Sequence, residues 1–422
     1  DNIVLVGETI MEEQLSLEAG TTVRAQSNKL VVLGGMISGA TASSPVTFTS
    51  NRSAPSPGDW GGVVLDGSTV NNLDYWRVRY AATGLTVRNV QPNSPVSMIE
   101  LDVASIQNDA VVLEATRVTA NGWTVTDTQK NAVVLDNSIF TATGWTITES
   151  GNGARVINES EGSITGGVFR DIGGTAVILE NATVDGLDGA VIEDFGSAGV
   201  YATGRSSAVT VTGAEIRQTG SRVRSGSGLW VRDGATLTVS GSTVERCGVG
   251  VDVSHRRDNN DAPQTVAATG NIITENGTGV RVNPGDANRY SGYREEEYPE
   301  LTVTGNAITS NVDWEVAIYR GKAARTTELD VTENWWGTRD GVAMAERIRD
   351  QSDDERSAFA DFIPFLDAAP DAEGQPTSQG PNGEQYHAGR VTGYNSWARA
   401  DNPHIVVGMV LVGAGGSLTV EG

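Results

Sequence analysis

The sequence predicts an all-β protein that folds as a right-handed, single-stranded parallel β-helix with about 22 residues in each coil. Two periodicities indicate this fold. A small residue followed by an aliphatic segment recurs every 22 residues, and so does a segment that starts with tryptophan; the positions are Ala110, Ala132, Ala154 and Ala176, and Trp123 and Trp145. The segments are short, rich in Val, Ile and Thr, and bounded by Gly, Asn or Asp, which is typical of strands joined by turns.

The repeat length and composition exclude two other common solenoids, the tetratricopeptide array and the leucine-rich repeat. A tetratricopeptide array needs longer amphipathic repeats, and the Leu-x-x-Leu-x-Leu spacing of leucine-rich repeats is missing. One coil cannot bury its own aliphatic side chains, but stacked coils form parallel sheets whose inward side chains make continuous columns. We expect such columns at Val112, Val134, Val156 and Ile178, or at their immediate neighbours.

The same anchors continue towards the C-terminus with longer intervals, which indicates loops inserted between intact coils; they are Gly199, Gly228, Gly250, Gly279 and Ala317. Residues 340–351 then predict a short helix, because Asp340 can cap it and Met344 and Ile348 share one face. This helix is expected to form part of a cap.

Three regions follow from these patterns. Residues 1–366 are expected to form the β-helix with its cap. Residues 367–386 are rich in Pro, Gly, Gln and Asp without periodicity, which is typical of a linker. Residues 387–422 form a tail whose segment 402–421 repeats the pattern of residues 2–7 and 15–18, so the tail resembles an opening coil.

An opening coil at this position leaves strand edges uncovered, which predicts head-to-tail assembly by strand addition. A contact between two different surfaces propagates as an open filament unless its rotation closes a ring. The alternatives are that the tail folds back on its own helix or opens a further domain. The predicted subunit interface consists of Ile3, Leu5, Leu15, Leu17, Ile405, Val407, Val410, Val412, Leu418 and Val420.

Several motifs carry a resemblance to a known group of proteins: 15–23, 44–50, 58–64, 302–306, 334–337 and 361–366. With them, roughly residues 3–366 resemble right-handed parallel β-helix surface proteins of the pectate-lyase-like superfold, including those with NosD-type or carbohydrate-binding and sugar-hydrolase repeats. The resemblance implies the fold. It does not specify the function, because this superfold hosts lyases, hydrolases, adhesins, tailspikes and structural fibres.

The charge is strongly negative. The formal net charge is −23, and only three of the 30 basic residues are lysines. This composition favours a halophilic source, in which high salt screens the self-repulsion; the alternative is an ordinary acidic secreted protein from a high-GC genome. Nucleic acid is not expected as a partner, because it is itself a polyanion.

Other features of the sequence indicate where the protein is located. Cys247 is the single cysteine, so an intrachain disulfide is excluded, and it is expected in the core. No apolar run is long enough to span a bilayer, and the start at Asp1 is interpreted as that of a processed, exported chain. The candidate glycosylation sites are Asn51, Asn158, Asn181 and Asn276.

Candidate chemistry is sparse. His255, His387 and His404 are far apart without metal-ligand spacing, and no nucleophile elbow accompanies them. Two polar insertions, 252–261 and 290–300, fall on consecutive coils and are candidates for a sugar-binding wall or a calcium site; the alternative is a pair of solvated loops at a subunit contact or the surface. No other ion or cofactor is expected.

Tryptophans at matching positions have two interpretations. Trp123 and Trp145 suit either a sugar-stacking platform or an aromatic stack within the wall, and the stack is favoured. Trp335 and Trp336 are interpreted as packing in the cap.

These observations together favour an extracellular structural protein of the cell surface over an enzyme. The expected partner is the chain itself, in a head-to-tail homopolymer, with surface glycans as further partners of an adhesive role. The signatures of β-helix lyases and polygalacturonases, clustered Asp pairs followed by a His or Arg motif, are not evident. The alternative is a polysaccharide-active β-helix enzyme, either a lyase, a glycosidase or a tailspike depolymerase.

Overall fold

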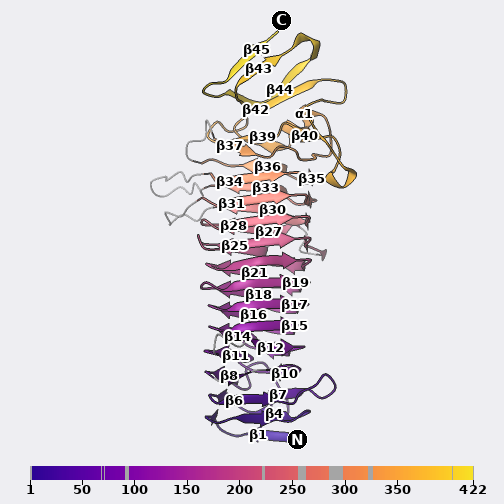
Figure 1. Ribbon diagram of the computed structural model, residues 1–422. Helices are drawn as coiled ribbons and strands as arrows, with labels where there is room; N and C mark the ends of the chain where they lie inside the picture. Colours follow the sequence, from indigo (N-terminus) through magenta and orange to yellow (C-terminus); the bar gives the residue numbers. More distant parts are fainter. Residues whose placement is uncertain are drawn as a thin grey trace, which may run out of the picture. The chain divides into compact units, whose positions relative to one another are not determined.

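The computed structural model describes residues 2–67, 69–70, 72–90, 95–220, 224–254, 263–284, 298–321, 327–401 and 403–421. The chain divides into two compact units: unit 1 contains residues 1–201 and 206–210, and unit 2 contains residues 202–205 and 211–422. Both units consist of short parallel strands stacked coil upon coil, so the protein is a right-handed parallel β-helix, as predicted (Figure 1).

Each coil of unit 1 contributes one strand to each of three columns, and all pairings are parallel. The first column contains β1 (Asn2–Leu5), β4 (Thr22–Ala25), β7 (Val46–Ser50), β10 (Trp76–Arg79), β13 (Asp102–Ile106), β20 (Val168–Ile172) and β23 (Val191–Phe195). The second contains β2 (Thr9–Met11), β5 (Lys29–Val32), β8 (Gly62–Asp66), β11 (Leu85–Arg88), β14 (Val111–Glu114) and β21 (Thr175–Glu180). The third contains β3 (Leu15–Leu17), β6 (Gly35–Ser38), β9 (Thr69–Val70), β12 (Val96–Ile99), β15 (Arg117–Asn121), β17 (Ile139–Thr143), β19 (Glu161–Thr165) and β22 (Thr183–Asp188).

Two long strands, β16 (Thr124–Asp136) and β18 (Thr146–Ile157), run through the first and second columns without a break. β24 (Ala198–Thr203) and β25 (Ala208–Thr212) contain the boundary between the units. Corners between columns use residues with left-handed backbone angles, which turn the chain sharply within one position.

The aliphatic columns exist, but most of the residues first expected in them face outward. Val112, Val134, Arg155 and Ile178 are paired in one outward row, whereas the inward row consists of their neighbours Leu113, Leu135, Val156 and Leu179. A register shift between β16 and β18, after Thr128, moves Val156 into the inward row. Because strand side chains alternate, this one-residue shift exchanges the two faces.

Large aromatic side chains fill the interior of unit 1. Trp123 and Trp145 are fully buried and stack with ring centroids 5.1 Å apart at an interplanar angle of 12°. The Trp123 indole N–H donates to the Met98 carbonyl oxygen at 2.8 Å. These tryptophans therefore form a stack within the wall, as favoured, and are not a surface platform for sugars.

Unit 2 repeats the three-column arrangement. Its first column contains β26 (Glu215–Arg217), β29 (Thr243–Glu245), β32 (Ile272–Thr274) and β35 (Ala307–Thr309). Its second contains β27 (Ser225–Arg232), β30 (Cys247–Ser254), β33 (Thr278–Asn283), β36 (Trp314–Ile318) and β38 (Ile348–Arg349). Its third contains β28 (Thr236–Ser240), β31 (Thr265–Thr269), β34 (Glu300–Thr304), β37 (Glu328–Asp330) and β39 (Phe359–Asp361). Cys247 is fully buried, as expected, and burial raises the pKa of its thiol far above the usual range.

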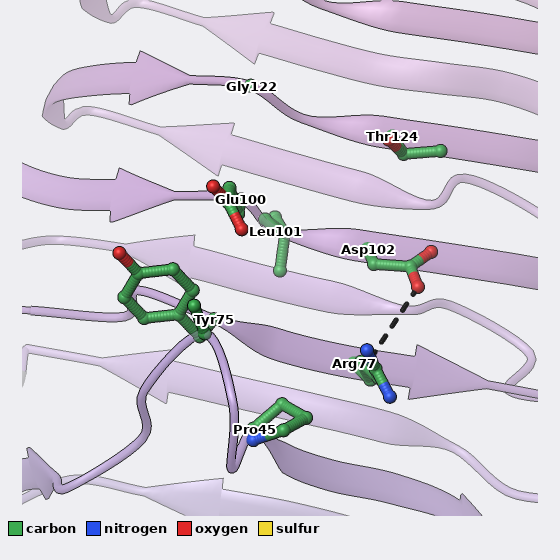
Figure 2. A pocket seen from close by; sticks show the side chains of 9 residues that line it. Pro45, Tyr75, Arg77, Glu100, Leu101, Asp102, Gly122 and Thr124 are labelled. Atoms are coloured by element: carbon green, nitrogen blue, oxygen red, sulfur yellow. Dashed lines mark ion pairs between the residues drawn. The ribbon is translucent and has the colours of Figure 1, made fainter.

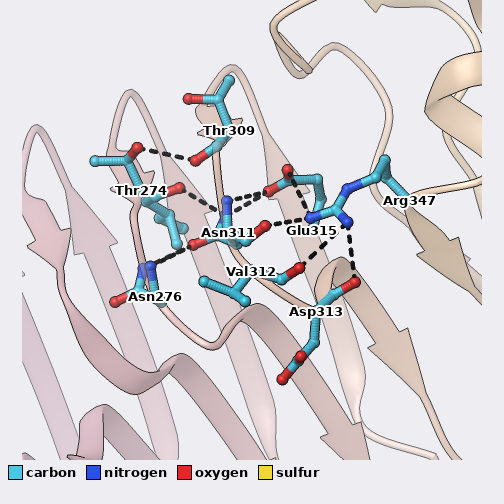
Figure 3. Close-up of polar contacts among 9 residues, drawn as sticks. Thr274, Asn276, Thr309, Asn311, Val312, Asp313, Glu315 and Arg347 are labelled. Atoms are coloured by element: carbon cyan, nitrogen blue, oxygen red, sulfur yellow. Dashed lines mark hydrogen bonds and ion pairs between the residues drawn. The ribbon is translucent and has the colours of Figure 1, made fainter. Parts of the chain in front are cut away.

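Buried asparagines hold successive corners of unit 2 together. The Asn276 side chain accepts from the Cys247 N–H at 2.9 Å. It also donates to the Asn311 side-chain oxygen at 3.0 Å (Figure 3). Asn311 in turn donates to Glu315, whose carboxylate also contacts Arg347 at 3.4 Å. Burial raises the pKa of Glu315. This ladder satisfies backbone and side-chain groups that would otherwise be buried without a partner.

The cap contains a helix shorter than predicted. α1 (Gly341–Ala345) begins after Asp340, whose carboxylate accepts from the N–H groups of Val342 and Ala343. Met344 and Ile348 are both buried, but Ile348 lies in strand β38 beyond the helix. The segment 367–386 contains the 3-10 helix η3 (Pro370–Ala372) and β41 (Pro376–Thr377), which pairs antiparallel with β40 (Phe365–Leu366).

The tail forms two further coils. β42 (Gln385–Val391) pairs in parallel with β44 (His404–Val412), and β43 (Tyr394–Trp397) pairs in parallel with β45 (Ser417–Val420); η4 (Arg399–Asp401) lies between the coils. The first of these coils packs on the cap of its own chain. Tyr386 is buried beside Phe365, and Arg390 donates to the Glu328 carboxylate at 3.0 Å.

Candidate functional site

A charged patch lies on the outward face of the first column of unit 1. β10 alternates buried and exposed positions, so Trp76 and Val78 face the core while Arg77 and Arg79 face solvent. The register places Arg77 beside Thr47 on one neighbouring strand and beside Asp102 on the other. Successive coils therefore bring together residues that are 25 positions apart in sequence.

The two arginines are held differently. Arg79 forms an ion pair with the Asp102 carboxylate and donates to the Asp102 backbone oxygen at 2.8 Å, and its side chain is 25% exposed. Arg77 only approaches the same carboxylate, at 3.9 Å, and its side chain is 51% exposed. Arg79 thus fixes the position of Asp102, while the Arg77 guanidinium keeps donors available for a ligand.

An open groove of about 450 Å³ surrounds this patch (Figure 2). The loop between β6 and β7 forms one wall, and the other side chains come from β10, β13, β16 and the corners before them. The lining residues are Ala42, Pro45, Tyr75, Arg77, Glu100, Leu101, Asp102, Gly122 and Thr124. This volume lies within the usual range of small-ligand sites, which is about 300–1,000 Å³.

Tyr75 and Glu100 reach the groove from strained positions. They precede the first-column strands with φ of 58° and 50°, and the corresponding corners of the next three coils are Gly122, Gly144 and Gly166. Holding a residue other than glycine in this left-handed backbone conformation costs about 1–3 kcal/mol of folding free energy, and such strain concentrates at functional sites. A second corner also carries strained residues with side chains, among them Asp127 and Glu149, so strain alone does not identify a site. Tyr75 and Glu100 differ because they border a groove.

The groove has the groups needed to bind a carboxylated sugar chain. Arg77 supplies a cation for a carboxylate, while Tyr75 and Glu100 add a hydroxyl and a carboxylate to the lining of the groove. The Asp102 carboxylate already forms ion pairs with two arginines, Arg77 and Arg79. A glycosidase would require two available carboxylates flanking one bond, and this groove offers only Glu100 outside an ion pair among its described lining residues.

A second carboxylate cluster lies at the junction of cap and tail. Burial and the neighbouring Glu328 and Asp330 raise the pKa of Asp361 to about 7. A pKa in this range suits a general acid or base. However, Gly389 of the tail packs directly against the Asp361 carboxylate, leaving no space even for a methyl group, and Arg390 covers Glu328. This cluster is therefore part of the contact between tail and cap.

The polar insertions expected to form a sugar-binding wall lie largely outside the described residues, namely at 255–262 and 285–297. Their described members have structural roles. Asp252 is buried and forms an ion pair with Arg281, and the Tyr298 hydroxyl donates to the Tyr319 backbone oxygen at 2.8 Å. Within the described ranges, no group of three His, Cys, Asp or Glu side chains is arranged to hold a metal ion such as calcium.

Two of the three histidines meet in the tail, although 17 residues separate them. The His404 Nε2–H donates to the Ala398 carbonyl oxygen at 2.7 Å, so its Nδ1 accepts from His387 Nε2 at 2.9 Å. The His387 ring stacks on Trp397 with centroids 3.9 Å apart. Burial and the neighbouring His404 lower the pKa of His387 to about 4. Trp336 is buried in the cap, as interpreted.

The candidate glycosylation sites differ in exposure. Asn276 is wrong as a candidate, because its side chain is fully buried in the asparagine ladder and both its nitrogen and its oxygen are hydrogen-bonded. Asn51, Asn158 and Asn181 are exposed, and glycosylation there stays a prediction.

The predicted interface residues lie in four strands. Ile3 and Leu5 belong to β1, and Leu15 and Leu17 belong to β3. Ile405, Val407, Val410 and Val412 belong to β44, while Leu418 and Val420 belong to β45. Only Leu17 among them is buried. In the tail, both β42 and β44 pack against strand β39 of the cap of their own chain.

Comparisons with known proteins agree with this architecture. Residues 103–265 match the model of the right-handed β-helix region, and residues 2–86 match that of the pectate-lyase-like β-helix domain. Both matches agree with the right-handed parallel β-helix fold of the structure, each over less than half of the chain. No curated protein matches its sequence. None of the helices in the described part of the chain has the length and apolar character to cross a bilayer.

Two solved structures are similar in fold. Both are crystal structures of the periplasmic alginate epimerase AlgG, one of them of a point mutant, with TM-scores of 0.42 for the mutant and 0.40 for the other. In each case the identity is 14%, and the match covers 65% of this chain and 72% of the other.

The match to the pectate-lyase-like domain overturns the expectation that this chain is not an enzyme. That domain is named for a polysaccharide-cleaving enzyme, and the matched region, residues 2–86, includes Tyr75 and Arg77 of the groove. The expectation depended on missing signatures in the sequence. It did not consider the candidate groove, whose residues come singly from different coils; the signal available in the sequence was the alternation in 76–80 with Asp102 one coil later.

Proposed function

We propose that this protein is an exported, polysaccharide-active β-helix protein that binds an anionic polysaccharide across the groove of unit 1. The observation that carries the proposal is the Arg77, Arg79 and Asp102 arrangement, with one fixed guanidinium and one available guanidinium on an open sheet face. The overall charge of −23 would repel a polyanion, so a local cationic site is needed for such a ligand.

The groove supports lyase chemistry better than hydrolysis. In a β-elimination, Arg77 would neutralise the uronate carboxylate and thereby acidify the proton on the adjacent carbon. A base removes that proton, the carbon–oxygen bond to the next sugar breaks, and the leaving oxygen gains a proton, which yields an unsaturated sugar end. Tyr75 and Glu100 are the groove residues with groups suited to these proton transfers.

The test is incubation with acidic polysaccharides, polygalacturonate and alginate, and with a neutral glucan. We expect binding of an acidic polymer and ultraviolet absorbance from unsaturated ends, both reduced at least tenfold by Arg77→Ala. The matched control is Arg117→Ala, which removes an exposed arginine from the third column of the same unit. Equal loss in both variants, or equal binding of the neutral glucan, would contradict the proposal.

A further inference from the structure

Most of the side chains that line the groove belong to two sets that run from coil to coil. The first set, the strand row, is an outward row of the first-column strands and contributes Arg77, Asp102 and Thr124, which the register places side by side. The second set, the corner column, lies two positions earlier in each coil. Its lining residues are Pro45, Tyr75, Glu100 and Gly122. The strand row therefore bounds one side of the groove and the corner column bounds the other (Figure 2).

The ionisable groups of the groove differ between its two sides. In the strand row, Arg77 is a cation that only donates hydrogen bonds, and the Asp102 carboxylate is held in ion pairs with Arg77 and Arg79. In the corner column, Tyr75 carries a hydroxyl group and Glu100 carries a carboxylate. Among the described lining residues, an ionisable donor and an ionisable acceptor for proton transfer are thus available in the corner column alone.

Tyr75 and Glu100 are direct neighbours in the corner column. The Tyr75 N–H donates to the backbone oxygen of Ile99, one residue before Glu100, at 2.7 Å. Adjacent strands are about 4.8 Å apart, so the two side chains start one coil apart at the same corner. The next corner is Gly122, which has no side chain. Both proton-transfer groups therefore lie on one side of the groove, and Arg77 lies on the other (Figure 2).

The side on which these groups lie matters for β-elimination, because the reaction removes the hydrogen on C5 of a uronate and releases the oxygen on its C4. In mannuronate and glucuronate, these two substituents are on the same face of the sugar ring. In galacturonate and guluronate, they are on opposite faces. A base and an acid that approach from one side can serve the first pair of sugars, whereas the second pair needs groups on both sides of the ring.

We infer that the groove cleaves O4-linked polymers of mannuronate or glucuronate by syn elimination, with Glu100 as the base and Tyr75 as the acid; this inference rests on the proposed function. Glu100 takes the C5 proton, the electrons of that bond form the double bond between C4 and C5, and the bond from C4 to the linking oxygen breaks. The leaving oxygen takes the proton of the Tyr75 hydroxyl. Glu100 then returns its proton to Tyr75, its neighbour on the preceding coil, so both groups are restored.

The first test compares polymannuronate, polyguluronate and polygalacturonate as substrates of the full wild-type chain, with binding measured by calorimetry and cleavage by ultraviolet absorbance. Because all three polymers carry the carboxylate that Arg77 recognises, we expect all three to bind. Cleavage of polymannuronate is expected to be faster by about tenfold or more. A smaller preference, or binding without cleavage, would overturn the inference and leave the proposed binding of an anionic polysaccharide intact. A chain that binds none of the three would contradict the proposed function itself.

The second test assigns the two proton transfers. Glu100→Gln and Tyr75→Phe should each lower the rate of polymannuronate cleavage by about 100-fold or more, with binding retained because Arg77 is unchanged. The matched controls are Glu114→Gln, on β14, and Tyr80→Phe, at the corner that follows β10; neither residue lines the groove. Circular dichroism establishes that all four variants are folded. Test variants that cleave as fast as their controls would show that the two groups do not carry the protons.

Discussion

At the scale of single residues, burial decides which polar side chains matter for stability. Asn276 and Asn51 both begin a glycosylation sequon, but only Asn276 lies in the interior. Its amide connects Cys247, Val244 and Asn311, so three buried groups depend on one side chain. The sequon pattern contains no information on burial, which explains why the sequence could not separate these two positions.

Asn276→Ala is expected to destabilise the protein by several kcal/mol. Each buried group left without its partner costs about 1–3 kcal/mol, and the variant leaves more than one. Asn51→Ala is the control, and an exposed substitution of this kind stays within about 0.5 kcal/mol. Chemical denaturation measures both. Equal midpoints for the two variants would show that the ladder contributes little to stability.

At the scale of elements, the sequence predicted the kind of structure better than its register. The 22-residue period identified the coils because residues stacked on successive coils share one environment. It misplaced the inward rows because both faces of β14, β16 and β21 are aliphatic, and a shift after Thr128 cannot be seen in a composition pattern. The groove was missed because Arg77 and Asp102 become neighbours only through the register between β10 and β13.

The tail is an element whose docking should depend on pH in two directions. The pKa of His387 is lowered from 6.5 to about 4, so its contribution to stability is complete above pH 6.5 and is lost as the pH falls through about 4. The pKa of Asp361 is raised from 3.8 to about 7, so its contribution is complete below pH 3.8 and is lost as the pH rises through about 7. Between about pH 4 and 7 the two contributions therefore change in opposite directions: that of His387 grows as the pH rises, and that of Asp361 shrinks.

Hydrogen exchange of the amides in 385–421, compared with those of the coils, measures this dependence. Because the two changes oppose each other, we expect the protection of the wild-type tail to vary little between about pH 4 and 7. His387→Gln leaves only the Asp361 dependence, so protection should fall as the pH rises through this range, whereas Asp361→Asn leaves only the His387 dependence, so protection should rise. If both variants keep the wild-type pH profile, the roles assigned to the two groups are wrong. The charged groups around them are His404, Glu328, Asp330 and Arg390.

At the scale of the whole molecule, the net charge of −23 and the repeating coils act together. Repetition stacks like residues, and where the repeated residue is acidic it stacks like charges. Asp127, Glu149 and Asp171 occupy the same corner on three successive coils of unit 1, next to strand pairs at Thr126, Thr148 and Arg170. Neighbouring strands are about 4.8 Å apart. Such a column gains repulsion at low ionic strength and loses it when salt screens the charges.

The melting temperature is therefore expected to rise with sodium chloride, most steeply between about 0.01 and 0.2 M, because the screening length falls from about 30 Å to below about 10 Å. Glu149→Gln removes the middle charge of the column, so it should raise the melting temperature at low salt and reduce the salt dependence. Glu161→Gln is the control, since this exposed residue is paired with Ile139 and Thr183, neither of them charged. If both variants respond to salt as the wild-type protein does, repulsion within the column is not what salt relieves.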